Sequence, residues 1–193
     1  MKYIMIAAIT VDGRIARDSN HPSDWTSPED KDFMHAELDK CDVIIVGNKT
    51  YELVKKPLSK RNCIVFTRSI DRTKQQDDKL IYINPKSKSI QKFIEEKSYK
   101  RVCILGGAQV YSYFLEHSLI DEIWLTIEPI IFGSGISLFG PSTSSGSTLI
   151  NNNEVDKKIE TREYKLVTVK QLNQQGTVLL HYIKDLPSLP RRG

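Results

Sequence analysis

Short apolar runs of strand length recur along most of the chain, and segments of helical periodicity separate them. The runs lie at Tyr3 to Thr10, Val43 to Val46, Cys63 to Thr67, Ile81 to Ile83, Val102 to Leu105 and Ile123 to Ile127. Helical periodicity is found over Ser27 to Lys40, near Thr50 to Val54, over Ser89 to Lys97 and over Ala108 to His117. Runs that are apolar on both faces belong to a sheet covered on both sides. The alternation therefore predicts an α/β fold with a largely parallel central sheet.

The end of the chain follows a different pattern. Two strand-like stretches, Tyr164 to Gln171 and Val178 to Lys184, are joined through the turn-forming sequence Asn173-Gln174-Gln175-Gly176, which predicts a terminal antiparallel hairpin. Pro141 to Thr148 is rich in Ser, Gly and Thr and is expected to be a loop, and residues 186–193 are expected to be a flexible tail. A chain of 193 residues with 39% hydrophobic residues supports one sizeable core. We therefore expect a single domain over residues 1–185.

The charge is mildly basic and spread along the sequence. The 28 Lys and Arg against 24 Asp and Glu give a formal charge of +4, which suits an anionic small molecule and does not indicate nucleic acid. No apolar run reaches the roughly 18 residues that a membrane helix needs, so we expect a cytoplasmic protein.

Cys41, Cys63 and Cys103 form no CxxC pair and are expected to be buried, reduced thiols. The four histidines form no ligand-like group, so no metal is expected and the histidines are taken as surface or loop residues.

Asp30 is the first candidate for chemistry. Ser27 is a good N-cap, and Pro28 suits the first position of the helix that would carry Asp30. Met34 lies four residues after Asp30, so the carboxylate shares the face that also carries apolar side chains. A half-buried carboxylate there could accept hydrogen bonds from the ring N–H and amino group of a heterocycle. The alternative is an acid that only complements the positive end of the helix.

Three strand ends carry residues suited to phosphate. Gly106-Gly107 lies between a strand and a helix, and Gly47 followed by Asn48-Lys49-Thr50 repeats this arrangement. Such turns bring backbone N–H groups and a positive helix end against a phosphate. At a third strand end, Thr67-Arg68-Ser69 offers two hydroxyls and a guanidinium, which suit the extra phosphate of NADPH. Together the three ends predict a dinucleotide across the carboxyl edge of the sheet.

An ordered set of motifs resembles the dihydrofolate reductase superfamily. It covers roughly residues 3–139 and comprises Ala-Ala-x-x-x-Asp-Gly-x-Ile (7–15), Trp25, Ser-Pro-Glu-Asp (27–30), Ile-Val-Gly-x-x-Thr-Tyr-Glu (45–52), Lys-Pro-Leu-x-x-Arg (56–61), Leu-Gly-Gly-Ala-x-Val-Tyr (105–111) and Ile-Asp-Glu-Ile-Trp-Leu-Thr (120–126). The resemblance implies a three-layer fold, a mostly parallel sheet with helices on both faces and a C-terminal hairpin. It also implies NADPH as cofactor.

The resemblance implies a role for each matching residue. Asp30 would relay the proton, Thr126 would support its carboxylate, and Trp25 would stand beside a mobile loop over the site. Met34 would pack on the substrate ring, together with Met5 and Ala7, and Arg61 would hold the glutamyl carboxylate of a folate. The expected cofactor residues are Ala8, Ile15, Gly47, Asn48, Lys49, Thr50, Thr67, Arg68, Ser69, Leu105, Gly106, Gly107, Ala108, Gln109, Val110 and Tyr111.

The sequence also departs from the reductase pattern. The family places proline directly before the loop tryptophan, whereas Ser23-Asp24 separates Pro22 from Trp25 here. Residues 130–139 resemble the reductase domain of the riboflavin-pathway deaminase/reductase. The stretch Tyr51 to Leu58, however, lacks the segment that binds the ribosyl phosphate in that branch. We therefore expect reduction of dihydrofolate, with the phosphoribosylamino-uracil or a related heterocycle as the alternative. A non-catalytic nucleotide-binding module is a second alternative, and the oligomeric state is left open between monomer and homodimer.

Overall fold

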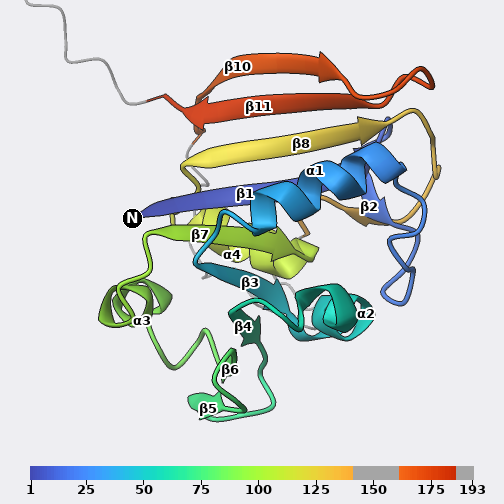
Figure 1. Ribbon diagram of the computed structural model, residues 1–193. Helices are drawn as coiled ribbons and strands as arrows, with labels where there is room; N and C mark the ends of the chain where they lie inside the picture. The colour runs from blue at the N-terminus through green and yellow to red at the C-terminus, as the bar shows by residue number, and fades with distance from the viewer. Residues whose placement is uncertain (141–160, 186–193) are drawn as a thin grey trace, which may run out of the picture.

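The computed structural model describes residues 1–140 and 161–185. Nine strands make up one sheet: β1 (Lys2–Thr10), β3 (Val43–Gly47), β4 (Cys63–Phe66), β5 (Thr73–Gln75), β6 (Leu80–Ile83), β7 (Arg101–Gly106), β8 (Glu122–Glu128), β10 (Tyr164–Gln171) and β11 (Val178–Lys184). Their order across the sheet is β10-β11-β8-β1-β7-β3-β4-β6-β5 (Figure 1). Two short strands, β2 (Arg14–Ala16) and β9 (Ile136–Ser137), pair separately from this sheet.

The middle of the sheet is parallel. β1 pairs in parallel with β7 and β8, β3 pairs in parallel with β4 and β7, and β4 pairs in parallel with β6. The terminal hairpin of β10 and β11 joins the edge of β8 in antiparallel orientation. These pairings confirm the predicted mostly parallel sheet and its C-terminal antiparallel hairpin. They also bring the carboxyl ends of the parallel strands together at one edge.

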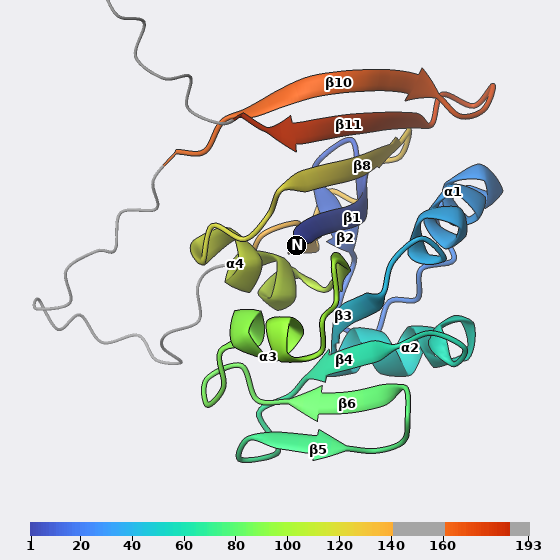
Figure 2. The same ribbon diagram turned by 60° about the vertical axis from the view of Figure 1, so that its left-hand side comes forward.

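Within the described part of the chain, four helices cover the two faces of the sheet. α1 (Pro28–Leu38) and α2 (Asn48–Leu58) lie on one face, and α3 (Ile90–Glu96) and α4 (Ala108–Glu116) lie on the other (Figure 2). Leu38 of α1 and Tyr51 of α2 pack with the strand side chains of the first face, and Phe93 of α3 and Phe114 of α4 pack with those of the second. The sheet is therefore buried on both sides, as its continuously apolar strands predict.

Some elements differ from the sequence-based expectation. α2 continues to Leu58, beyond the expected end near Val54, and it is kinked where Val54 has φ −116° and ψ 20°. β2, β5 and β9 were not predicted, because strands of two or three residues carry too little apolar pattern. The expected loop over Pro141 to Thr148 and the expected tail over 186–193 lie outside the described residues. Among the described helices, none is both long and apolar enough to cross a membrane.

The cysteines and one histidine can also be compared with expectation. All three cysteines are free; Cys63 and Cys103 are buried, as expected, whereas Cys41 is only half-buried. His181 is not a surface or loop residue. It lies in β11, stacks on Trp124 with ring centroids 3.7 Å apart, and its Nε2 lies 2.9 Å from Oε1 of Glu122.

Candidate active site

A cleft of about 1080 Å³ opens at the edge of the sheet where β1, β3, β4 and β7 end. Ala7 and Ala8 of β1 line it, together with side chains of α1 and α2. The N-terminus of α4 and the residues that follow β4 line it as well. A cleft at the carboxyl ends of parallel strands is the usual place for a ligand in an open α/β sheet.

Most of the predicted site residues line this one cleft. They are Ala7, Ala8, Ile15, Trp25, Asp30, Met34, Gly47, Asn48, Lys49, Thr50, Thr67, Arg68, Ser69, Leu105, Gly107, Ala108, Gln109, Val110 and Tyr111. Four others do not line it: Met5, Arg61, Gly106 and Thr126. Met5 is fully buried in the core beneath the cleft, and Thr126 lies behind Asp30, with which it interacts.

Asp30 is buried in the first turn of α1, with 7% of its surface exposed. Ser27 fixes this turn, because its hydroxyl accepts a hydrogen bond from the Asp30 backbone N–H at 3.3 Å. Loss of solvation raises the pKa of the Asp30 carboxyl above its ordinary value, and hydrogen bonds from the Thr126 and Thr26 hydroxyls partly oppose this rise. The carboxyl can therefore take up a proton more easily than an exposed aspartate can.

The two helices that begin at the cleft have N-termini without a side-chain cap. α2 begins after Gly47 and α4 begins after Gly107, and these N-cap glycines have no side chain that could accept a hydrogen bond from the first turn. A Cβ added at Gly47 would lie 3.3 Å from Cγ2 of Val110, and one at Gly107 would lie 3.1 Å from Oγ1 of Thr50. The backbone here leaves room for a ligand but little for a side chain. Uncapped N–H groups beside glycines fit the pyrophosphate of a dinucleotide.

Gly106 has a different role from its neighbour. It adopts φ +104°, and a Cβ there would lie 2.8 Å from the Tyr111 hydroxyl oxygen. That hydroxyl donates a 2.7 Å hydrogen bond to the carbonyl of Ile6 in β1. Gly106 therefore permits α4 to be tied to β1 beneath the cleft.

The loop between β2 and α1 is anchored by Phe132. The guanidinium of Arg17 lies 4.2 Å from the centre of the Phe132 ring. The rings of Trp25 and His21 meet it edge-on, with centroids 5.2 and 5.4 Å away. Asp12 holds the backbone at this point, since its carboxylate accepts hydrogen bonds from the N–H groups of Phe132 and Gly133. Trp25 and His21, which both line the cleft, are thus held from a distant part of the sequence.

Arg61 lies away from the cleft and its donors are already engaged. Its Nε donates to Oδ1 of Asp39 at 2.8 Å, and its Nη1 donates to the carbonyl of Pro57 at 2.6 Å. It borders a smaller pocket of about 500 Å³ beside Tyr82. The guanidinium would have to leave these partners to reach a carboxylate in the main cleft, so its expected role stays a prediction.

Several cleft residues were not predicted from the sequence. Thr26 supports Asp30, Lys31 and His35 lie on the cleft side of α1, and Lys86 follows β6. Lys86 could have been predicted, because β6 pairs in parallel with β4 and the carboxyl end of β6 therefore lies at the same edge of the sheet. Lys31 and His35 needed the orientation of α1, which helical periodicity alone does not fix, and Thr26 needed the path of the chain just before that helix.

The fold is shared by solved structures of reductases. A pyrimidine reductase-like protein from Corynebacterium diphtheriae superposes with a TM-score of 0.71 at 14% identity, covering 96% of this chain and 92% of that one. A deaminase/reductase from Thermotoga maritima superposes with a TM-score of 0.67 at 20% identity, covering 95% of this chain and 56% of that one. At these identities the likeness concerns the fold alone.

Sequence comparisons give the family. YwjB, an uncharacterised protein of Bacillus subtilis, is 29% identical over 191 residues, which cover 95% of this chain and 98% of YwjB. The type 9 dihydrofolate reductase of Escherichia coli is 25% identical over 126 residues, which cover 63% of this chain and 67% of the reductase. The family model described as dihydrofolate reductase matches residues 2–133, which contain β1 to β8 and most of the cleft. The chain therefore belongs to the dihydrofolate reductase family.

Proposed function

We propose that this protein is an NADPH-dependent reductase that passes a hydride to a flat nitrogen heterocycle. The observation that carries this proposal is one shared cleft, lined both by buried Asp30 and by the glycine-bearing strand ends Gly47 and Gly107. Bound NADPH supplies the hydride, and the protein must orient the two reactants and manage one proton. Membership of the dihydrofolate reductase family supports the same reaction class.

The residues at the strand ends would hold the cofactor. The uncapped N–H groups at the starts of α2 and α4 would bind its pyrophosphate. Thr67, Arg68 and Ser69 follow β4 at the same edge and line the cleft. Arg68 is exposed, and a guanidinium beside two hydroxyls suits a phosphate monoester. This set supports NADPH as the cofactor over NADH, which lacks that phosphate.

Asp30 would bind and help protonate the substrate. A carboxylate can accept hydrogen bonds from a ring N–H and an adjacent amino group at once. Because burial raises the pKa of Asp30, the carboxyl can bring a proton into the cleft at a higher pH than an exposed aspartate can. Protonation of the ring nitrogen makes the neighbouring carbon a better hydride acceptor. The Thr126 hydroxyl, behind the carboxyl, would hold its orientation.

Two heterocycles fit a cleft with Asp30 in this role, and a different observation favours each. Dihydrofolate carries the N–H and amino pair that suits Asp30, and the family match favours it. The phosphoribosylamino-uracil of the riboflavin pathway has no glutamyl tail, so it needs no arginine to bind such a tail. It is favoured because Arg61 lies outside the cleft, where it donates hydrogen bonds to Asp39 and Pro57. We propose dihydrofolate as the first substrate to test and the uracil compound as the second.

The test is a turnover assay with both substrates. Purified protein is mixed with NADPH and either dihydrofolate or the uracil compound, and loss of the nicotinamide absorbance is followed. We expect turnover with one of them, and a much higher Michaelis constant for NADH than for NADPH. Tight NADPH binding without turnover of either substrate would point instead to a non-catalytic nucleotide-binding module. Absence of NADPH binding would refute the proposal.

A further inference from the structure

Glu128, at the end of β8, is a buried acid that touches the start of α1. Only 4% of its surface is exposed. Its Oε1 accepts a 2.7 Å hydrogen bond from the backbone N–H of Ser27, the residue that caps α1. The Ser27 hydroxyl in turn accepts from the Asp30 N–H. Glu128 is therefore linked to Asp30 through a single residue.

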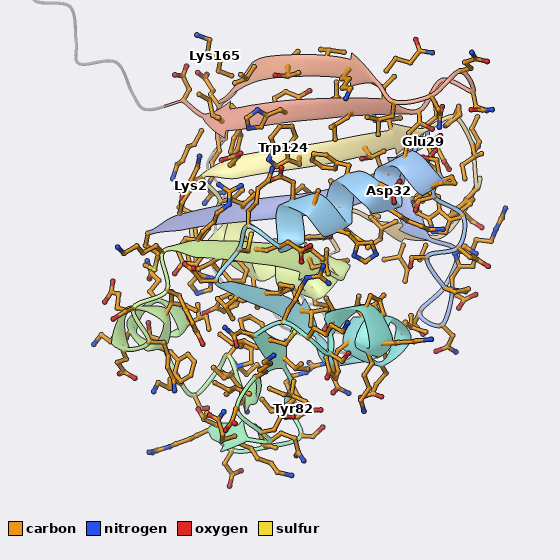
Figure 3. All side chains as sticks on the ribbon, viewed as in Figure 1. Lys2, Glu29, Asp32, Tyr82, Trp124 and Lys165 are labelled. Atoms are coloured by element: carbon orange, nitrogen blue, oxygen red, sulfur yellow. The ribbon has the colours of Figure 1, made fainter. Side chains whose placement is uncertain are left out.

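The same carboxylate also holds the turn of the C-terminal hairpin. Its Oε2 accepts a 2.6 Å hydrogen bond from the hydroxyl of Thr177, which is 1% exposed. The Oδ1 of Asn173 accepts from the Thr177 N–H at 3.1 Å, and its Nδ2 donates to Oε2 of Glu29 at 3.1 Å. Figure 3 shows Glu29 on the first turn of α1, close to the end of β8. The turn is thus joined to α1 at two points.

Stability alone gives a poor reason for this arrangement. Burying a carboxylate costs several kcal/mol unless charge or hydrogen bonds compensate it. Within residues 1–140 and 161–185, Glu128 makes no salt bridge, and its two oxygens receive the two hydrogen bonds described above. A neutral side chain of the same size could bridge Ser27 and Thr177 without that cost.

We propose that Glu128 is a positioning residue for Asp30: it fixes the first turn of α1 to the hairpin turn and places a negative charge beside the cleft acid. This inference rests on the proposed reductase function. It assigns a role in the reaction to the C-terminal hairpin, which contributes no residue to the cleft lining.

The charge of Glu128 acts on Asp30 together with other groups. Glu128, facing Asp30 from β8, raises the pKa of Asp30, and Lys31 of α1 lowers it. The hydroxyls of Thr126 and Thr26 lower it as well, and Tyr111 faces Asp30 from α4 as a neutral phenol. Removing the charge of Glu128 while keeping its shape should therefore lower the pKa of Asp30 without altering the cofactor side of the cleft.

Three variants separate the charge from the hydrogen bonds. Glu128→Gln keeps the volume and removes the charge. Thr177→Val keeps the charge and removes the hairpin hydroxyl, and Thr177→Ser restores that hydroxyl. The readouts are the titration of the Asp30 carboxyl carbon by NMR, kcat with the substrate that turns over, and the dissociation constant of NADPH. The titration needs no turnover, so it remains informative if the proposed function fails.

The expected results differ between variants. In Glu128→Gln the Asp30 titration and the high-pH limb of kcat both move to lower pH, and NADPH affinity is unchanged. In Thr177→Val the Asp30 titration stays in place and kcat falls by about ten-fold, whereas Thr177→Ser retains wild-type kcat. An unmoved Asp30 titration in Glu128→Gln, or equal kcat in the two Thr177 variants, would overturn the inference. If the wild-type protein binds NADPH but reduces neither substrate, while the Asp30 titration still shifts in Glu128→Gln, only the proposed function is refuted.

Discussion

Replacing Asp30 by asparagine changes the charge on the cleft wall while keeping the shape of the side chain. The amide oxygen can still accept hydrogen bonds from the Thr126 and Thr26 hydroxyls, but the amide cannot carry a proton to the substrate. Loss of a positioned proton donor costs about 10² to 10⁴ in rate, which corresponds to about 3–5 kcal/mol of transition-state stabilisation. We expect a fall of this size in kcat near neutral pH and little change in NADPH affinity, because the strand ends that would bind NADPH are not altered.

The same variant has a predictable effect on stability. The folded-state pKa of Asp30 is raised above its ordinary value of 3.8 by burial. Below the unfolded-state pKa the carboxyl is protonated in both states, so asparagine gives no advantage there. As the pH rises above that value, the folded state carries the cost of ionising a desolvated acid, about 1.4 kcal/mol for each unit of elevation. Asp30→Asn should therefore be more stable than wild type at neutral pH, and the difference should vanish in acid.

Two assays check this prediction. Steady-state kinetics with NADPH measure kcat, and urea unfolding at neutral pH and again below about pH 4 measures the free energy of unfolding. The reasoning is refuted if the variant turns over at the wild-type rate. It is also refuted if the variant is less stable than wild type at neutral pH, because that would mean the ionised carboxylate stabilises the fold.

Other substitutions test the remaining parts of the site. Gly107→Ala should weaken NADPH binding at least about ten-fold with little loss of stability, whereas Gly106→Ala should cost about 1–3 kcal/mol of stability because of its positive φ. Calorimetric titration measures the NADPH affinity, and urea unfolding measures the stability. Equal effects of the two substitutions would contradict the distinction between the two glycines. Phe132→Ala removes the ring that anchors the loop between β2 and α1. We expect greater mobility of Trp25, measured by fluorescence anisotropy, and a higher Michaelis constant for the heterocycle. An unchanged anisotropy would contradict the anchoring role of Phe132. Arg61→Ala should change the Michaelis constant of dihydrofolate little, because the Arg61 donors are already engaged; a rise on the order of ten-fold would restore its expected role in holding the glutamyl tail.

The fold was largely predictable because the strands are apolar on both faces. Continuous runs such as Tyr3 to Thr10 leave few alternatives to a covered parallel sheet, and the hairpin was bounded correctly over Tyr164–Gln171 and Val178–Lys184. The short strands β2, β5 and β9 were not predicted because each has only two or three residues, too few to show an apolar pattern. The second half of α2 was not predicted, because a proline such as Pro57 usually indicates the end of a helix. Here the helix continues through Pro57, beyond a kink at Val54.

The site was predictable where it depends on strand ends and less so where it depends on distant contacts. Gly47, Gly107 and Arg68 follow apolar runs, and parallel pairing alone brings them to one edge. Glu128 and Phe132 act through residues about 100 positions away in the sequence, as the separations of 101 between Ser27 and Glu128 and 120 between Asp12 and Phe132 show. No local pattern indicates such pairings. Likewise Arg61 matches a family motif, but its ion pair with Asp39 depends on how α1 lies beside α2.

A crystal structure of the protein with NADP⁺ and a heterocyclic substrate or inhibitor would test most directly whether one cleft holds both the cofactor and the substrate. We expect the pyrophosphate on the N–H groups at the starts of α2 and α4, with the ring N–H and amino group of the heterocycle on the carboxylate of Asp30. A dinucleotide bound away from Gly47 and Gly107, or a heterocycle that does not touch Asp30, would contradict it.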